Sequence, residues 1–533
     1  MNTDIKTQKL PDKFYLLHDN SAAENRPNRL CICLSDLHFT DGTVGTQSAE
    51  VVVWKEVFDK VVDMCSSKEI KELTLILDGD VVDMIRTALW SKNNVYPWQR
   101  EHPCFKRILR EIMQGIIEQH ATPSTDENKC CFFHLLKHLP ERLNDCTLQT
   151  LAIVGNHDKE LFADDETLKM FYEQCLNQPI ENLSKEYRRW IGNMYFNNPD
   201  YYADLKSVPR LPFYWGDQGF RLLVTHGQWR DIDNSRLIKP QQDKPGWQVK
   251  DGWQLAIWQK LDFAPFTQAC FGDTVAAGVL SGFIYRTKQR LDLLEKTLIS
   301  QETPEDKEIN RLKKIVDELD LYRPTYAALQ RIIKEIWRLR KKDKSMNKIE
   351  EIIQEELLNS IYTWLGWDFT IESAPPTRRF ILHAARLLSG VLKFFGGQIE
   401  LGFLYAVMWL LNRLKQGVFF RSDSPSYKEM QDFPTFLEEY RNCGFRIHGE
   451  GHTHIPLQDE LSFNDSNNDN YTYINFGTWR DQILLKQKKG YRRRGFGRAL
   501  SVIDLTPNDS SPERGFAYWV EDIVHWDISL DRL

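Results

Sequence analysis

The chain has 533 residues, of which 42% are hydrophobic and 27% are charged, and its formal net charge is -6. This balance is typical of a folded protein and excludes the disordered and fibrous classes, and the length predicts at least two packed units. A net negative charge gives no general attraction to nucleic acid or to an anionic membrane, so either partner would need a local basic patch.

Residues 1–28 precede the first predicted strand and are expected to form an N-terminal extension. Between Met1 and Asp19 they mix charged and polar residues and contain no apolar signal core, which predicts a cytoplasmic location. The 10 cysteines lack the regular spacing of a disulfide scaffold and the spacing of a zinc knuckle, so we expect reduced, buried thiols.

Four apolar runs are typical of buried strands, and each is followed at once by polar residues. They cover residues 30–34, 73–77, 148–154 and 220–224, and residues 51–64 between the first two show helical spacing. The first two runs therefore predict a β-α-β unit. Open α/β sheets build their sites just beyond strand ends, so the polar residues are candidates for a shared site.

Residues 247–440 change in character, and we expect an inserted, all-helical domain there. Long helical patterns occupy residues 312–340, 349–364 and 379–414. Strand patterns return at residues 445–448, 471–476 and 499–505. The first fold, over residues 29–246, is therefore expected to resume over residues 441–533.

The loops after the predicted strands offer a mixed set of oxygen and imidazole ligands. Such a set suits divalent transition metals, and the absence of cysteine from these loops disfavours a purely structural zinc site. Any one of these histidines alone would more often be an ordinary hydrogen-bonded residue. The candidate ligands are Asp36, His38, Asp80, Asn156, His226, His452 and His454.

At these residues the sequence resembles the calcineurin-like metallophosphoesterase family, whose five ordered motifs are all present. The resemblance covers roughly the first 230 residues and the last 90 and excludes the helical middle. The motifs are Asp36-Leu37-His38, Gly79-Asp80-Val81-Val82-Asp83, Gly155-Asn156-His157-Asp158, His226-Gly227 and Gly451-His452-Thr453-His454.

The resemblance implies a two-sheet αββα sandwich and a dinuclear site. It assigns one metal to Asp36, His38 and His454, the other to Asn156, His226 and His452, and a bridging role to Asp80. A hydroxide that bridges the two metals would attack the phosphorus. The metals are expected to be Mn, Fe or Zn, since this ligand set does not choose among them.

Further residues receive roles from the same resemblance. His157 is expected to stabilise or protonate the leaving oxygen in a charged form, with Asp83 as its carboxylate partner. Asp158 and Asn475 are expected to support the ligands from behind. For Asp83 and Asp158, capping of loops and helices by the carboxylate oxygens is the alternative interpretation.

The insertion allows several interpretations. Because both of its ends leave ligand-bearing loops, we favour a cap that selects the substrate over a docking or oligomerisation domain. Residues 387–414 are apolar but interrupted by charges and glycines, so we expect core packing, with a peripheral membrane or lipid contact as the alternative. A basic cluster over residues 486–498 is either a solvated hairpin or a guide for anionic substrates.

The predicted function is hydrolysis of a phosphodiester or pyrophosphate in a small-molecule, nucleotide or lipid-linked substrate. One alternative is a nuclease that uses the same metals. The basic cluster is too short to establish nucleic-acid binding, so a nucleic-acid substrate is the less favoured one. The other is a noncatalytic protein-binding scaffold with the same fold. No residues of this chain are assigned to substrate binding at this point.

Overall fold

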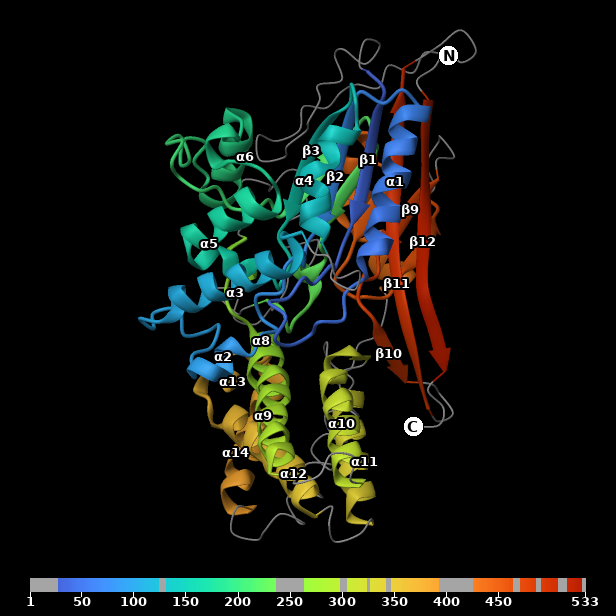
Figure 1. The fold of residues 1–533 in the computed structure, drawn as a ribbon. Coiled ribbons are helices and arrows are strands. Elements are labelled where there is room, and N and C mark those ends of the chain that lie inside the picture. The colour runs from blue at the N-terminus through green and yellow to red at the C-terminus, as the bar shows by residue number, and fades with distance from the viewer. Residues whose placement is uncertain are drawn as a thin grey trace.

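The structure is a computed structural model, and it describes residues 27–123, 131–235, 263–297, 304–323, 326–341, 347–392, 425–463, 470–485, 490–506 and 515–529. It shows an α/β protein whose described strands form two mixed β-sheets, with a largely helical middle region over residues 271–390 (Figure 1).

The larger sheet has the strand order β3-β2-β1-β11-β10-β6, and β12 pairs with β11 outside this path. Its β1, β2 and β3 run parallel to one another, whereas β11 runs antiparallel to β1, β10 and β12. Parallel neighbours need a crossover, and helix α1 supplies it between β1 and β2 as predicted. The strands are β1 Arg29–Leu34, β2 Glu72–Asp78, β3 Thr147–Ile153, β6 Tyr322–Arg323, β10 Gln482–Leu485, β11 Tyr491–Leu505 and β12 Gly515–Ser529.

The smaller sheet has the strand order β4-β5-β7-β9-β8, with parallel β5, β7 and β9 in its centre. Strands β7 and β9 follow the helical middle in sequence, yet they belong to the same sheet as β5, which precedes it. Arg29 of β1 connects the two sheets through buried ion pairs to Asp217 of β4 at 3.0 Å and Asp504 of β11 at 2.8 Å. The strands are β4 Tyr214–Asp217, β5 Leu222–Thr225, β7 Ile447–Glu450, β8 Leu457–Leu461 and β9 Tyr471–Asn475.

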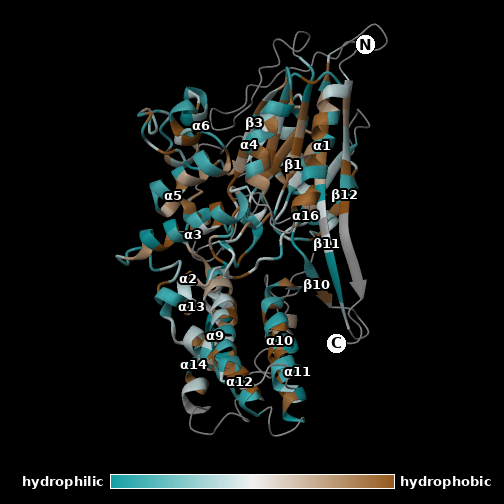
Figure 2. Cartoon of the chain, in the orientation of Figure 1, coloured by the Kyte–Doolittle hydropathy of each residue, from teal (hydrophilic) through white to brown (hydrophobic). Residues whose placement is uncertain are grey.

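Amphipathic helices flank the sheets, and apolar (brown) and polar (teal) residues alternate along them in Figure 2. In α1 the buried residues Val51, Trp54, Phe58, Val61 and Cys65 recur every three or four positions, which places them on one face. The helices outside the middle region are α1 Val51–Ser67, α2 Leu89–Asn93, α3 Phe105–His120, α4 Phe132–Arg142, α5 Asp165–Met170, α6 Lys185–Phe196, α16 Tyr427–Gln431 and α17 Glu438–Asn442.

The helical middle forms a lobe beyond one end of the sheets (Figure 1). Its own apolar core also includes Ile483 of β10 and Tyr491 of β11, so the lobe packs against the larger sheet rather than standing apart. Its helices are α8 Phe271–Asp273, η8 Thr274–Ser281, α9 Gly282–Lys296, α10 Pro304–Asp317, α11 Tyr326–Arg340, α12 Asn347–Gly366, α13 Asp368–Ser373 and α14 Pro376–Leu392.

The prediction of one helical run over residues 312–340 is wrong, and so is the prediction that the insertion is entirely helical. Helix α10 ends at Asp317, and the chain then enters β6, which pairs in parallel with β10. A proline follows Arg323 in the sequence, and a residue that precedes proline avoids the helical conformation. The apolar spacing continued through this segment because Leu319 and Leu321 are buried, not because they belong to a helix.

The apolar stretch over residues 387–414 lies mostly outside the described residues. Its first residues, Leu387 and Leu388, belong to α14 and are exposed by 75% and 48%, so this part of the expected core is not buried. No helix in the described part of the chain combines the length and the apolar character that a bilayer-spanning segment needs.

Candidate metal centre

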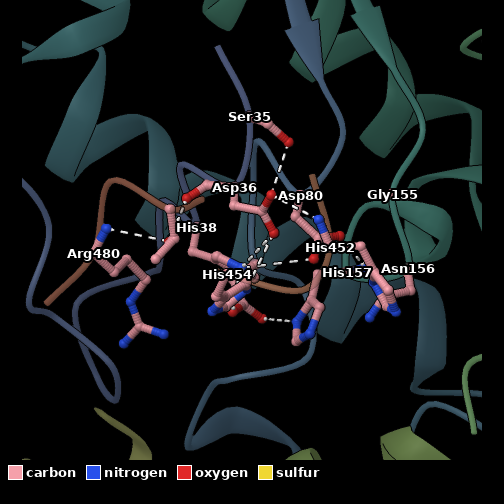
Figure 3. Close-up of polar contacts among 12 residues, drawn as sticks. Ser35, Asp36, His38, Asp80, Gly155, Asn156, His157, His452, His454 and Arg480 are labelled. Carbon is pink, nitrogen blue, oxygen red and sulfur yellow. Dashed lines mark hydrogen bonds and ion pairs between the residues drawn. The ribbon is translucent and has the colours of Figure 1, made fainter. Parts of the chain in front are cut away.

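The polar loops that follow five strands converge on one place, as Figure 3 shows for most of their side chains. Asp36 and His38 follow β1, and Asp80 follows β2. Further ligand candidates come from the loops that follow β3, β5 and β7, and these carry Asn156, His226, and the pair His452 and His454. Segments more than 400 residues apart in sequence therefore meet at the carboxyl ends of both parallel sets of strands.

Within this convergence, three overlapping groups of side chains could hold metal ions. In each group the candidate ligand atoms lie within 4.8 Å of one another. Asp80 belongs to two of the three groups and is the one carboxylate that these two groups share. The groups are Asp36, His38, Asp80 and His454; Asp80, His226 and His452; and His38, Asp83 and His157.

The individual distances show how closely the side chains pack. In the first group His38 Nε2 lies 3.6 Å from Asp80 Oδ2 and 2.9 Å from His454 Nε2. In the second group His226 Nε2 lies 3.4 Å from the same oxygen, Asp80 Oδ2. Asp36, His38, Asp80 and His226 are nearly fully buried, whereas His452 is only partly buried, so the cluster keeps one more accessible side.

Five of the candidate ligands have backbones in the left-handed region, which is uncommon for residues other than glycine. Their φ angles are 54° at Asp36, 49° at His38, 49° at Asp80, 67° at His452 and 60° at His454. Such conformations persist only where the surrounding structure enforces them, and they concentrate at functional sites. The concentration of this strain on ligand candidates supports a site rather than an ordinary polar cluster.

Glycines in the motifs let the loops approach one another. A Cβ atom at Gly155 would lie 2.2 Å from Asp80 Oδ1, and one at Gly451 would lie 2.2 Å from Asp36 Oδ2. A Cβ atom at Gly79, whose φ is +73°, would lie 2.4 Å from the ring of His226. No real side chain tolerates these distances, so the glycines make room for the carboxylates and the imidazole.

Hydrogen bonds around the histidine rings leave one nitrogen of each ring directed at the cluster. His226 Nδ1–H donates to the carbonyl of Asp78 at 2.7 Å, and its buried Nε2 has no hydrogen-bond partner. His38 Nδ1 lies 3.0 Å from Asp83 Oδ2, so its Nε2 carries the lone pair that faces His454 Nε2 at 2.9 Å. Because metal-binding histidines hold their second nitrogen in this manner, the donor set fits a metal.

An acidic residue that the sequence did not single out contacts a histidine of the second group. His452 Nε2 lies 2.8 Å from Asp231 Oδ2, and His452 Nδ1 lies 2.8 Å from Asn156 Oδ1. If Nε2–H donates to Asp231, the Nδ1 lone pair and the Asn156 oxygen face the same position, as two ligands of one cation do. The only sequence signal was the position of Asp231, five residues after His226 in the same loop.

The structure brings together His157 and Asp83, the pair expected to act on the leaving group. His157 Nδ1 lies 2.8 Å from Asp83 Oδ1, and the Arg86 guanidinium, which the sequence did not flag, lies 3.0 Å from Asp83 Oδ2. Burial favours the neutral acid at Asp83, but His157 and Arg86 outweigh it and hold its pKa well below the usual range. Burial lowers the pKa of His157 despite Asp83, so the protein environment favours a neutral ring rather than the charged ring we expected.

Two carboxylates of the first group, Asp36 and Asp80, are held in the charged form. Burial would raise the pKa of both Asp36 and Asp80, but His226 and the other neighbouring rings lower it strongly. Negative charge is therefore available at the centre of the cluster, where a cation would need it.

Asp158 and Asn475 hold backbone segments and do not enter the three groups. Asp158 Oδ1 accepts from Val82 N and its Oδ2 from Gly155 N, both at 2.9 Å, so its side chain joins two ligand-bearing loops. Asn475 Nδ2 donates to Gly451 O at 2.7 Å. These contacts agree with supporting positions behind the ligands and with the capping interpretation of Asp158.

The described part of the predicted basic cluster is largely paired. Arg493 forms ion pairs with Asp481 and Glu318, and Arg498 pairs with Asp522. Lys486, Lys488 and Lys489 lie outside the described residues. A different arginine, Arg323 of β6, approaches the candidate centre with Nη2 3.5 Å from His454 Nδ1. The sequence did not indicate this arginine, because its segment was predicted to belong to a helix.

Comparison of the chain with protein-family models, with curated proteins and with solved structures finds no match.

Proposed function

We propose that this protein is a dinuclear metal-dependent phosphoesterase with a calcineurin-like fold. The observation that carries the proposal is Asp80, a buried carboxylate shared by two adjacent groups of candidate ligands. Two groups that share one carboxylate are what a pair of metal ions needs, and paired ions suit displacement at phosphorus. The ordered motifs and the two mixed sheets also support it.

The ligand sets follow the groups. One cation would be held by Asp36, His38 and His454, and the other by Asn156, His226 and His452, and both groups would use Asp80. Metals at such positions supply Lewis-acid activation of water and neutralise phosphoryl charge. Oxygen and imidazole ligands suit Mn, Fe or Zn.

The chain's own groups position the reaction. Asp83 accepts a hydrogen bond from His157 Nδ1–H and fixes the orientation of the ring. Nε2 is then the ring atom that interacts with the leaving oxygen, and it protonates that oxygen when the ring carries a second proton. Asp231 holds His452 in the same manner. The substrate is proposed to be a small phosphodiester or pyrophosphate, with the helical middle acting as a cap.

A nuclease with the same metals is the second candidate, and the structure disfavours it at one point. A nucleic-acid channel needs unpaired basic side chains, whereas Arg493 and Arg498 are bound to carboxylates. A noncatalytic scaffold would have no need for five strained ligand backbones.

Metal analysis combined with a hydrolysis assay tests the proposal. The purified full-length chain is reconstituted with manganese, its metal content is measured, and turnover of bis(4-nitrophenyl) phosphate is followed. Asp80→Asn keeps the side-chain size but removes the shared charge, so we expect lower metal content and a fall in turnover of about 100-fold or more.

Asp145→Asn is the matched control, because Asp145 is 93% exposed and lies outside the three groups. It should retain both metal content and turnover. Full metal occupancy and normal turnover in Asp80→Asn would overturn the assignment. Absence of turnover in the wild type on nucleotides, sugar nucleotides and diesters alike would favour the scaffold instead.

A further inference from the structure

Arg323 reaches the candidate centre from the helical middle, not from the strand-end loops. The two-residue strand β6 pairs with β10, with Arg323 opposite Leu484. Nearby, Arg480 forms a buried ion pair with Asp320 at 2.6 Å, which anchors the segment just before the strand. Gln482 Nε2 donates to the His454 carbonyl at 2.8 Å, so β10 also contacts a loop that carries ligands. The position of Arg323 beside His454 is therefore fixed by the fold.

The hydrogen bonds of Arg323 leave part of its guanidinium uncommitted. Its Nη1 donates to the carbonyls of Asp320 at 2.7 Å and Tyr322 at 3.0 Å. Among the described residues, its Nη2 makes only the 3.5 Å contact to His454 Nδ1, which is at the outer limit for a hydrogen bond. This edge of the planar fork is free to donate to another acceptor.

Positive charge is concentrated here without a matching carboxylate. Arg86 pairs with Asp83 and Arg480 pairs with Asp320, but Arg323 has no ion-pair partner among the described residues. Arg323 is partly buried, and the nearby carboxylates of Asp320 and Asp83 are already paired with Arg480 and Arg86, so an anionic ligand would complete the contacts of its guanidinium.

We propose that Arg323 is a specificity-determining residue that binds an anionic oxygen of the substrate adjacent to the scissile phosphoester, so that the site prefers a pyrophosphate to an isolated phosphodiester. The inference rests on the proposed function and narrows its substrate class. The partner of Arg323 is the second phosphate group, on the side of the centre next to His454.

The charges of the two substrate classes explain why Arg323 would favour a pyrophosphate. An isolated diester carries one negative charge, which the cations of the centre face. A pyrophosphate diester carries a second negative charge on the neighbouring phosphate, and that charge needs a partner of its own. A guanidinium suits this role because it remains charged and presents donors in a planar fork that matches phosphate oxygens.

The test compares two substrates in Arg323→Gln, Arg323→Lys and the wild type. The probes are UDP-glucose, which contains a pyrophosphate, and bis(4-nitrophenyl) phosphate. We expect Arg323→Gln to lower the ratio of kcat/KM for UDP-glucose to kcat/KM for the diester by about tenfold or more, mainly through KM. Arg323→Lys, which keeps the charge, should recover part of the ratio.

A binding measurement separates the inference from the proposed function. Titration calorimetry with methylenediphosphonate, which cannot be hydrolysed, should show about tenfold weaker binding to Arg323→Gln than to the wild type. Arg340→Gln is the matched control, because Arg340 lies in the same helical middle and pairs with Glu350 on α12. Melting temperature and metal content are measured for every variant, and Arg323→Lys serves if Arg323→Gln does not fold.

The outcomes differ for the two ideas. Wild-type turnover together with an unchanged substrate ratio and unchanged diphosphonate binding in Arg323→Gln would overturn the role of Arg323 and leave the phosphoesterase intact. Diphosphonate binding that depends on Arg323, with no turnover of any phosphoester by the wild type, would support the anion site and overturn the enzyme. A ratio that falls equally in Arg340→Gln would also contradict the inference.

Discussion

At the scale of single residues, the candidate centre combines strained backbones with fixed ring orientations. Left-handed φ angles at residues such as Asp36 and His454 cost on the order of 1 kcal/mol or more each, which neighbouring contacts must offset. Thr478 Oγ1 and Trp479 N both donate to the carbonyl of Asp36, and Asp158 joins two of the loops. The ligand positions are thus preorganised by backbone hydrogen bonds rather than by the ligands themselves.

His157 offers a test at this scale, because its backbone and side chain serve different groups. Its backbone N–H donates to Asp80 Oδ1 at 2.8 Å, and its ring contacts Asp83. His157→Gln keeps the backbone bond, so we expect normal metal content but a fall in kcat of about 100-fold or more, because the ring proposed to act on the leaving oxygen is lost. Metal analysis and steady-state kinetics measure the two effects.

The control for this variant is His138→Gln. The side chain of His138 is 46% exposed and lies beside Glu141, outside the three groups. It should behave as the wild type. Loss of metal from His157→Gln would instead make His157 a ligand, in agreement with its place in the third group.

At the scale of elements, the short segment before and within β6 attaches the helical middle to the larger sheet. Asp320, at the end of the turn that precedes β6, is fully buried with Arg480, and Arg493 of β11 reaches Glu318 at 2.7 Å. Two residues of strand pairing would be weak alone. The buried ion pair and the apolar core that the lobe shares with Ile483 hold the segment in place.

Asp320→Asn tests this attachment. Removing one partner of a buried ion pair leaves the other charge uncompensated, so we expect the free energy of unfolding to fall by about 3 to 5 kcal/mol. Asp317→Asn, three residues earlier, breaks only a half-exposed pair with Lys288 and should change stability by less than about 1 kcal/mol. Urea denaturation of both variants compares them, and equal stabilities would show that the buried pair does not anchor the segment.

At the scale of the whole molecule, the candidate ligands come from loops after β1, β2, β3, β5 and β7, which lie on both sides of the helical middle in sequence. A cation bound by Asp36 and His454 would therefore connect the beginning and the end of the fold. Without cations, several buried carboxylates lie close together and repel one another. Metal binding is expected to stabilise the native chain as a unit.

Chelation measures this contribution. Because ions that bind only the folded state raise its stability by mass action, removal with EDTA should lower the melting temperature by several degrees, and manganese should restore it. Asp80→Asn should respond less to EDTA than the wild type. An identical melting temperature before and after verified metal removal would contradict a site that bridges both parts of the chain.

The sequence by itself predicted the strands and the loops that carry the ligands. The apolar runs that correspond to β1, β2, β3, β5, β7 and β9 were evident because a buried strand is a local pattern bounded by polar residues. The seven candidate ligands were likewise found from short motifs that sit at those strand ends. A strand end aims its loop, so local sequence was enough to predict that these side chains would meet.

Only the tertiary structure decided which other residues reach the centre. Asp231, Arg86 and Arg323 carry no motif, and each acts on a ligand or its partner through contacts made when distant segments pack together. The helical spacing that continued through residues 318–323 concealed β6, because burial against a sheet and burial on a helix face leave similar apolar patterns. The nonlocal pairing with β10 makes this segment a strand rather than a helix, and it places the Arg323 guanidinium beside His454.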